Sequence, residues 1–190
     1  MTTTTTPDLE ATYLRAVLHE LDRTLADHHP PTTPLRTIYF GGGTPSLAQA
    51  STILAILDRV QRYCTLAEDV EITIEMDPGT FDASYLRALS SSRMAGSSTS
   101  RWRVSLGVQA ADDTVLASLG RTHRRVDIDD AVRLLHTSST IQSVSMDLIT
   151  GVPGVSLAAW MDCLATAVHT WQPDHLSVYD LQVEPVRMYE

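Results

Sequence analysis

Short apolar runs rich in β-branched residues alternate along the chain with longer stretches that carry apolar residues at helical spacing. The short runs predict five strands, at 37–40, 70–75, 103–108, 143–149 and 175–181. The helical periodicity predicts six helices, at 9–25, 47–60, 82–89, 112–119, 128–135 and 157–169. Because strands and helices alternate, the strands are expected to be parallel and joined by right-handed crossovers. The pattern therefore predicts an α/β fold with one parallel sheet.

A glycine-rich turn follows the first predicted strand and precedes the next helix. Gly41, Gly42 and Gly43 stand together there and are followed by Thr44. Glycine permits positive φ angles and leaves backbone N–H and C=O groups accessible to a ligand. Ser46 is expected to cap the helix that follows. Taken alone, the turn is equally compatible with a structural connection that binds no ligand.

Polar residues stand at the ends of the other four predicted strands. They are Glu75, Gln109, Asp147 and Gln182. In parallel α/β folds, ligands bind at the carboxyl edge of the sheet. Each residue taken alone is compatible with a solvated loop. Their equivalent positions, together with the glycine turn, predict the rim of one pocket.

Composition and charge narrow the class of protein. A chain of 190 residues with 43% hydrophobic content is long enough for one domain with a sizeable core. The formal charge of −9 and the lack of a long basic cluster argue against a nucleic-acid partner. The sequence contains no apolar run long enough to predict a membrane span.

The cysteines and the N-terminal sequence bear on localisation. Cys64 and Cys163 lie far apart in the sequence and are expected to be buried free thiols. Two distant cysteines and the lack of a signal-peptide pattern predict a cytoplasmic protein. A mitochondrion or plastid is the alternative if an upstream targeting segment is missing.

Six short motifs occur in a fixed order along the chain. They are YFGGGTPS (39–46), EMDP (75–78), VSLGVQ (104–109), LGRTH (119–123), SMDLI (145–149) and SVYDLQVE (177–184). In order and spacing, the chain resembles radical S-adenosylmethionine (SAM) proteins from residue 13 to residue 184. The resemblance is to the group that contains oxygen-independent coproporphyrinogen III oxidases and HemW-type heme chaperones. The last three motifs are more similar to the chaperone branch.

The resemblance implies a fold and a domain organisation. Residues 9–190 would form a partial TIM-type barrel, a radical SAM core that lacks its first strand. A disordered Thr-rich tail is expected at 1–8. About half of the serine-rich stretch 90–103 is expected to be a flexible insertion, because the family makes this connection in fewer residues.

The resemblance also implies roles for individual residues toward SAM. Gly42, Gly43 and Thr44 would contact the methionyl ammonium group. Arg121 would bind the methionyl carboxylate through its planar fork of N–H groups. The alternative for Arg121 is a surface ion pair with Asp112 or Asp113.

The remaining predicted site residues are polar groups at the strand ends. Glu75 and Asp147 would accept hydrogen bonds from ribose hydroxyls or the ammonium group, and Gln109 can both donate and accept. Gln182 aligns with a family position near the adenine. The alternative for Asp147 is to cap the turn that follows its strand. His123 is expected to be a loop or helix-start residue rather than a ligand.

The departures from the family pattern limit the expected chemistry. The family's [4Fe–4S] cluster is held by three closely spaced cysteines, which this chain lacks. We therefore expect no metal ligands and no catalytic residues in this sequence. In the family, the cysteine loop precedes the helix expected at residue 9, and a C-terminal domain implicated in heme binding follows the barrel. The sequence is therefore expected to be an incomplete chain.

The motifs and the departures together leave several functional hypotheses open. The favoured one is a SAM-binding part of a radical SAM protein of heme or porphyrin metabolism, similar to the heme chaperones and with heme or porphyrin as its partner. Within the same family, an oxygen-independent coproporphyrinogen III oxidase, which decarboxylates two propionate side chains, stays open. Outside radical chemistry, the chain could be a cluster-free module that binds SAM or a nucleotide, or an inactive remnant with an exposed sheet edge.

Overall fold

The computed structural model describes residues 7–27, 33–90 and 101–182. Most of the predicted Thr-rich tail, at 1–6, and the main part of the predicted insertion, at 91–100, lie outside the described residues. Helix α1 (Pro7–Asp27) begins earlier than expected and includes the last two residues assigned to the tail.

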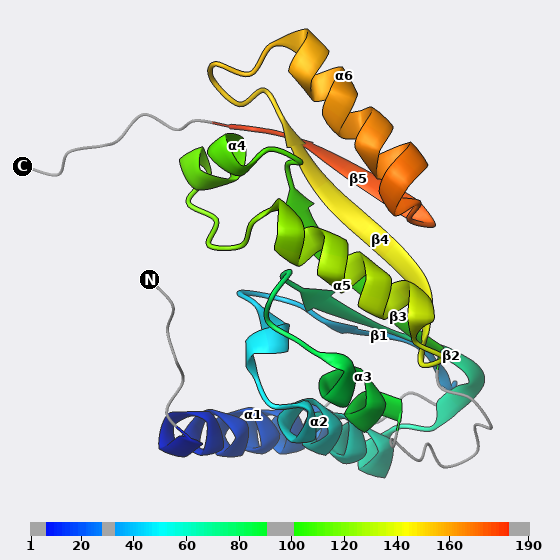
Figure 1. The fold of residues 1–190 in the computed structure, drawn as a ribbon. Coiled ribbons are helices and arrows are strands. Elements are labelled where there is room, and N and C mark those ends of the chain that lie inside the picture. Colours follow the sequence, from blue (N-terminus) through cyan, green and yellow to red (C-terminus); the bar gives the residue numbers. More distant parts are fainter. Residues whose placement is uncertain (1–6, 28–32, 91–100, 183–190) are drawn as a thin grey trace, which may run out of the picture.

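Five parallel strands form one sheet, in the spatial order β1-β2-β3-β4-β5. The strands are β1 (Leu35–Phe40), β2 (Leu66–Met76), β3 (Arg101–Gln109), β4 (Ile141–Thr150) and β5 (His175–Asp180). Spatial order that follows chain order is the arrangement of a TIM-type barrel. The predicted α/β partial barrel is therefore confirmed (Figure 1).

The helices lie along one side of this sheet (Figure 1). Besides α1, they are α2 (Ala50–Tyr63), α3 (Ala83–Ser90), α4 (Asp113–Ser118), α5 (Arg125–Thr137) and α6 (Leu157–Thr166). A short 3₁₀ helix, η1 (Pro45–Leu47), precedes α2. The last predicted helix continues beyond α6 as a π-helical turn, η2 (Ala167–Trp171).

The two faces of the sheet differ in polarity. On β3, Trp102, Val104 and Leu106 are fully buried on the helix side. Ser105 and Gln109, at odd-numbered positions of the same strand, belong to the opposite face, because side chains alternate along a strand. A parallel sheet covered by helices on both faces carries almost continuous apolar strands. The alternation found here therefore leaves one polar, concave face, and the cavity described below opens on it.

The prediction that Ser46 caps the helix after the glycine turn was wrong. Ser46 lies inside η1, and its hydroxyl accepts a hydrogen bond from the backbone N–H of Asp77 at 3.2 Å. Helix α2 begins later, at Ala50, and Glu10 of α1 supplies the carboxylate at its N-terminus. Oε1 of Glu10 accepts from the N–H of Gln49 at 2.7 Å and from the Thr52 hydroxyl at 2.5 Å. A carboxylate satisfies the free N–H groups of a helix start and interacts favourably with the helix dipole.

Candidate functional site

A cavity of about 240 Å³ lies at the carboxyl ends of the strands. Six of the eight predicted site residues line it: Gly43, Thr44, Glu75, Gln109, Arg121 and Asp147. Gly42 adjoins the cavity through a hydrogen bond to Glu75. The structure thus brings together residues from several strands and from the connections that follow them, as expected for a ligand site in a parallel sheet.

The glycine turn borders open space. Gly42 and Gly43 have φ angles of 92° and 62°, a region that side-chain-bearing residues rarely adopt. A Cβ atom at either position would meet no atom of the described residues within 4 Å. The backbone here is therefore free of covering side chains, and a ligand can approach it closely.

Glu75 is fixed from two sides. Its Oε2 accepts from the N–H of Gly42 at 3.0 Å, and its Oε1 accepts from the Tyr39 hydroxyl at 2.7 Å. Burial and the bond to the Glu75 carboxylate raise the pKa of Tyr39 to about 12, so its hydroxyl stays protonated as a donor. A Cβ at Gly41 would lie 2.5 Å from the Tyr39 ring, so glycine at this position makes room for that ring.

Asp147 has one carboxylate oxygen with a partner and one without. Oδ2 accepts from the Ser105 hydroxyl at 3.0 Å. Oδ1 is buried and has no hydrogen-bond partner among the described residues. The alternative that Asp147 caps the following turn finds no support in these contacts. A buried carboxylate oxygen without a partner is costly, so this position favours a ligand that donates a hydrogen bond.

Arg121 is placed by the end of helix α4. Gly120, with φ of 71°, ends the helix in the left-handed conformation. The N–H of Gly120 donates to the carbonyl of Ala117 and the N–H of Arg121 donates to that of Leu116, at 3.1 and 2.9 Å. This pair of bonds is a Schellman motif, which fixes the direction of the chain after the helix. It places Arg121 at the cavity.

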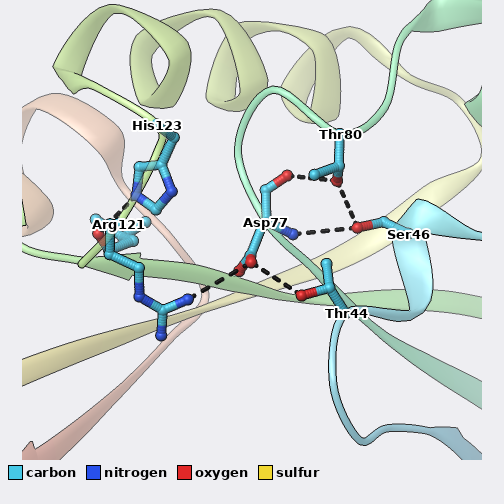
Figure 2. Close-up of polar contacts among 7 residues, drawn as sticks. Thr44, Ser46, Asp77, Thr80, Arg121 and His123 are labelled. Atoms are coloured by element: carbon cyan, nitrogen blue, oxygen red, sulfur yellow. Dashed lines mark hydrogen bonds and ion pairs between the residues drawn. The ribbon is translucent and has the colours of Figure 1, made fainter. Parts of the chain in front are cut away.

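The ion-pair partner of Arg121 is Asp77, so the alternative pairing with Asp112 or Asp113 was wrong. Nη1 of Arg121 lies 3.5 Å from Oδ2 of Asp77, and both side chains are partly exposed (Figure 2). The Asp112 carboxylate instead caps α4, accepting from the backbone N–H groups of Thr114 and Val115. The motif pattern predicted no separate role for Asp77.

The backbone at Gln109 is strained. Its φ is 66°, and the N–H of Ala110 donates to the carbonyl of Val108 across it at 2.8 Å, closing a three-residue turn. A non-glycine residue in this region is uncommon, and such strain concentrates at functional sites. The turn holds the buried Gln109 side chain at the cavity.

Gly107 supplies a testable prediction about the cavity floor. A Cβ at this position would lie 2.5 Å from Oδ1 of Asp77 and 3.1 Å from Nε2 of Gln109. We expect Gly107→Ala to displace both side chains and to reduce ligand affinity by roughly tenfold or more. Calorimetric titration measures this loss. Gly120→Ala cannot serve as the control, because the φ angle of Gly120 is positive. Ala110→Gly, directly after β3, changes side-chain size without a clash and is the control. Equal affinity of Gly107→Ala and the wild type would contradict the prediction.

Two residues considered in the sequence analysis, Gln182 and His123, do not line the cavity. Gln182 is exposed just after β5 and does not line the cavity, where Tyr179 and Ile149 lie instead. His123 is buried in the connection between α4 and α5, with Nε2 3.3 Å from the carbonyl oxygen of Val108. It is a loop residue, as predicted, held by the backbone (Figure 2).

The cysteines of this sequence do not fit an iron–sulfur cluster. Cys64 and Cys163 are free and buried, as predicted, and burial raises the pKa of the Cys163 thiol. They belong to different parts of the fold, at the end of α2 and within α6. In the described part of the chain, no three His, Cys, Asp or Glu side chains are grouped as metal ligands. A [4Fe–4S] cluster needs several converging thiolates, and the residues present do not supply them.

A larger cavity, of about 750 Å³, lies elsewhere. It lies between the loop after β3 and helix α6, where Val152 and Trp160 form part of its wall, and it contains none of the predicted site residues. In choosing between the two cavities as a binding site, we give the chemistry of the lining residues more weight than the volume. The smaller cavity combines a strained Gln109 with an unpartnered carboxylate oxygen on Asp147, which are features expected of a binding site.

The fold defines a class: α/β proteins with a parallel half-barrel sheet, in which polar side chains gather around a cavity at the carboxyl ends of the strands. The sequence model of the Radical SAM superfamily matches residues 14–167. The chain therefore belongs to the radical SAM superfamily.

Similarity to individual proteins narrows the assignment within this superfamily. It is 40% identical over 178 residues to the heme chaperone HemW of Synechocystis, covering 94% of this chain and 40% of that protein. The Escherichia coli heme chaperone HemW is 34% identical over 177 residues, with 93% and 44% covered. A mitochondrial radical S-adenosyl methionine domain-containing protein 1 from Bos taurus is 36% identical over 152 residues, with 79% and 32% covered. The chain is thus related to the HemW heme chaperones and spans less than half the length of these relatives.

A solved structure supports the fold. Coproporphyrinogen III oxidase (HemN) from Escherichia coli, described as a radical SAM enzyme, superposes with a TM-score of 0.76 at 23% identity. The match covers 90% of this chain and 37% of the oxidase. Across the part of the chain that the structure describes, no helix is both long and apolar enough to cross a membrane.

Proposed function

We propose that this chain binds S-adenosylmethionine in the cavity at the strand ends. The observation that carries the proposal is the buried Oδ1 of Asp147, which lines the cavity, has no partner among the described residues and favours a ligand that donates a hydrogen bond. Membership of the radical SAM superfamily makes SAM the ligand to test first.

The residues of the cavity suit the groups that SAM carries. The Arg121 guanidinium matches the methionyl carboxylate, and the hydroxyl of Thr44 together with the backbone at Gly43 offers acceptors for the ammonium group. Glu75 and Asp147 offer carboxylate oxygens for hydroxyl or ammonium donors. SAM would supply the activated carbon–sulfur bond on which the family's chemistry depends, and this chain's residues would bind and orient it.

The biological role that we propose is that of the HemW heme chaperones. The support is the identity of 34–40% to proteins named heme chaperones over more than nine tenths of the chain. Heme or a porphyrin is accordingly the proposed partner. The likeness to the oxidase HemN, at 23% identity, supports the fold and gives the oxidase role no comparable support.

Ligand-dependent stabilisation tests the proposed binding. A ligand that binds only the folded chain stabilises it by about 2.7 kcal/mol at a concentration 100 times its Kd. Thermal unfolding with SAM, and separately with adenosine, should show saturable stabilisation that is larger for SAM. The test variant is Asp147→Asn, which retains the volume of the side chain and should reduce the stabilisation by SAM. Equal shifts with SAM and adenosine would favour a nucleotide-binding module, and no shift with either would refute the proposal.

SAM cleavage gives a separate prediction. Because the sequence has only Cys64 and Cys163, the 190-residue chain should not cleave SAM after anaerobic treatment with iron, sulfide and dithionite. Chromatography for 5′-deoxyadenosine measures the outcome. Production of 5′-deoxyadenosine above a protein-free control would show that another ligand set in this chain supports the cluster.

A further inference from the structure

Asp77 lies between two predicted SAM-binding residues and touches both. Its Oδ2 accepts from the Thr44 hydroxyl at 3.1 Å and lies 3.5 Å from Nη1 of Arg121 (Figure 2). Thr44 belongs to the turn after β1 and Arg121 to the connection after α4. A single carboxylate at the end of β2 therefore joins the two sides of the cavity.

The backbone and side chain of Asp77 are held firmly. Its N–H donates to the Ser46 hydroxyl at 3.2 Å, and its carbonyl accepts from the Thr80 hydroxyl at 2.7 Å. The Ser46 and Thr80 hydroxyls are themselves 2.5 Å apart. Below the side chain, Gly107 leaves the space that Oδ1 occupies. Asp77 is thus the fixed member of its ion pair.

Arg121 uses little of its hydrogen-bonding capacity on Asp77. A guanidinium has five N–H donors arranged as a planar fork, and the only side-chain contact found for Arg121 among the described residues is that of Nη1. The contact is long and the arginine side chain is 33% exposed, so the ion pair between Arg121 and Asp77 is weak by itself. The edge formed by Nε and Nη2 stays available for a second carboxylate.

We propose that Asp77 is a positioning residue for the ligand carboxylate: it holds one edge of the Arg121 guanidinium so that the Nε–Nη2 edge faces the cavity. Asp77 itself does not touch the ligand in this arrangement. The consequence is selectivity, because Asp77 should matter only for ligands that carry a carboxylate. The inference rests on the proposed function, in which Arg121 binds the methionyl carboxylate of SAM.

Two probes separate positioning from general structural support. S-adenosylhomocysteine carries the carboxylate, whereas 5′-methylthioadenosine has the same nucleoside and thioether and lacks the amino-acid group. Asp77→Asn should weaken binding of S-adenosylhomocysteine by roughly two- to fivefold, the equivalent of losing a partly exposed ion pair, and that of 5′-methylthioadenosine by far less. Asp69→Asn, which removes the surface pair with Arg36 at the other end of β2, is the matched control and should change neither affinity.

A double-mutant cycle gives a readout that mere destabilisation would not produce. In the Arg121→Ala background, Asp77→Asn should cause no further loss of S-adenosylhomocysteine affinity, since its effect passes through Arg121. Thr80→Val removes the hydroxyl contacts to the Asp77 carbonyl and to Ser46 without altering any charge, while the Thr80 N–H keeps its own bond to that carbonyl at 3.2 Å. It should therefore show a smaller loss of affinity with the same selectivity for the carboxylate-bearing probe. This second variant keeps the proposal testable if Asp77→Asn does not fold.

The outcomes distinguish the two proposals. Equal losses for both probes would make Asp77 a structural residue, and tighter binding of S-adenosylhomocysteine to Asp77→Asn would make it a competitor of the ligand. Either result overturns the positioning role while leaving SAM binding intact. A wild-type chain that binds neither probe would refute the proposed function, and the inference with it.

Discussion

Arg121→Ala is expected to weaken SAM binding by roughly 10- to 100-fold, the range for losing hydrogen bonds to a charged group. Arg121 is the cationic side chain that lines the cavity, and one third of it is exposed. The substitution removes the planar fork that can bind the methionyl carboxylate through two N–H groups. Arg121→Lys should recover only part of the affinity, because an ammonium group cannot form the planar contact.

Calorimetric titration of SAM or S-adenosylhomocysteine measures the effect of Arg121→Ala. Arg133→Ala provides the matched control, because Arg133 is 70% exposed on α5 and pairs with Asp130 away from the cavity. The control should bind as the wild type does. Unchanged affinity in Arg121→Ala would remove Arg121 from the binding site and leave the carboxylate to another group.

Trp102→Ala is expected to destabilise the fold by about 3–5 kcal/mol, the usual cost of truncating a large buried aromatic side chain. Trp102 is fully buried on the helix side of β3, and its ring stacks on Phe40 of β1 with centroids 6.5 Å apart. The substitution would leave a cavity where three strands meet the helices. For a domain of this size, the expected fall in melting temperature is about 6–20 °C.

Thermal and denaturant unfolding measure the effect of Trp102→Ala. Trp102→Phe preserves an aromatic ring and removes the indole N–H, which is buried without a partner among the described residues. It should therefore cost much less than alanine. A loss below about 1 kcal/mol for the alanine variant would mean that the space is filled by rearrangement of its neighbours.

The order and type of the strands were predictable because their signal is local. Apolar β-branched runs are short, and each is followed by glycine or polar residues, so each strand is visible within about ten residues of sequence. The cap of α2 was not predictable in this way. Its carboxylate comes from Glu10, 39 positions before Gln49, and no local pattern connects the two. Ser46 has the right residue type at the right place, but it is used by Asp77 instead.

The site was partly predictable for a related reason. The glycine turn and the strand-end residues follow from the rule that ligands bind at the carboxyl edge of the sheet. Asp77, Ser105 and Tyr179 also line the cavity, and they share the alternating register of the concave face. Following that alternation along each strand would have found them. Gln182 follows the end of β5, so its predicted place near the adenine stays a prediction.

Because the sheet has an apolar face and a polar face, alternate residues of one strand are subject to different constraints on substitution. Residues on the helix side, such as Val104 and Leu106, are constrained by packing, because their size and shape fill the core. Residues on the concave side, such as Ser105, are constrained instead by hydrogen bonds and by the shape of the cavity that they line. Successive positions in one strand can therefore evolve at different rates, and a relative can acquire a new ligand preference without losing a stable barrel.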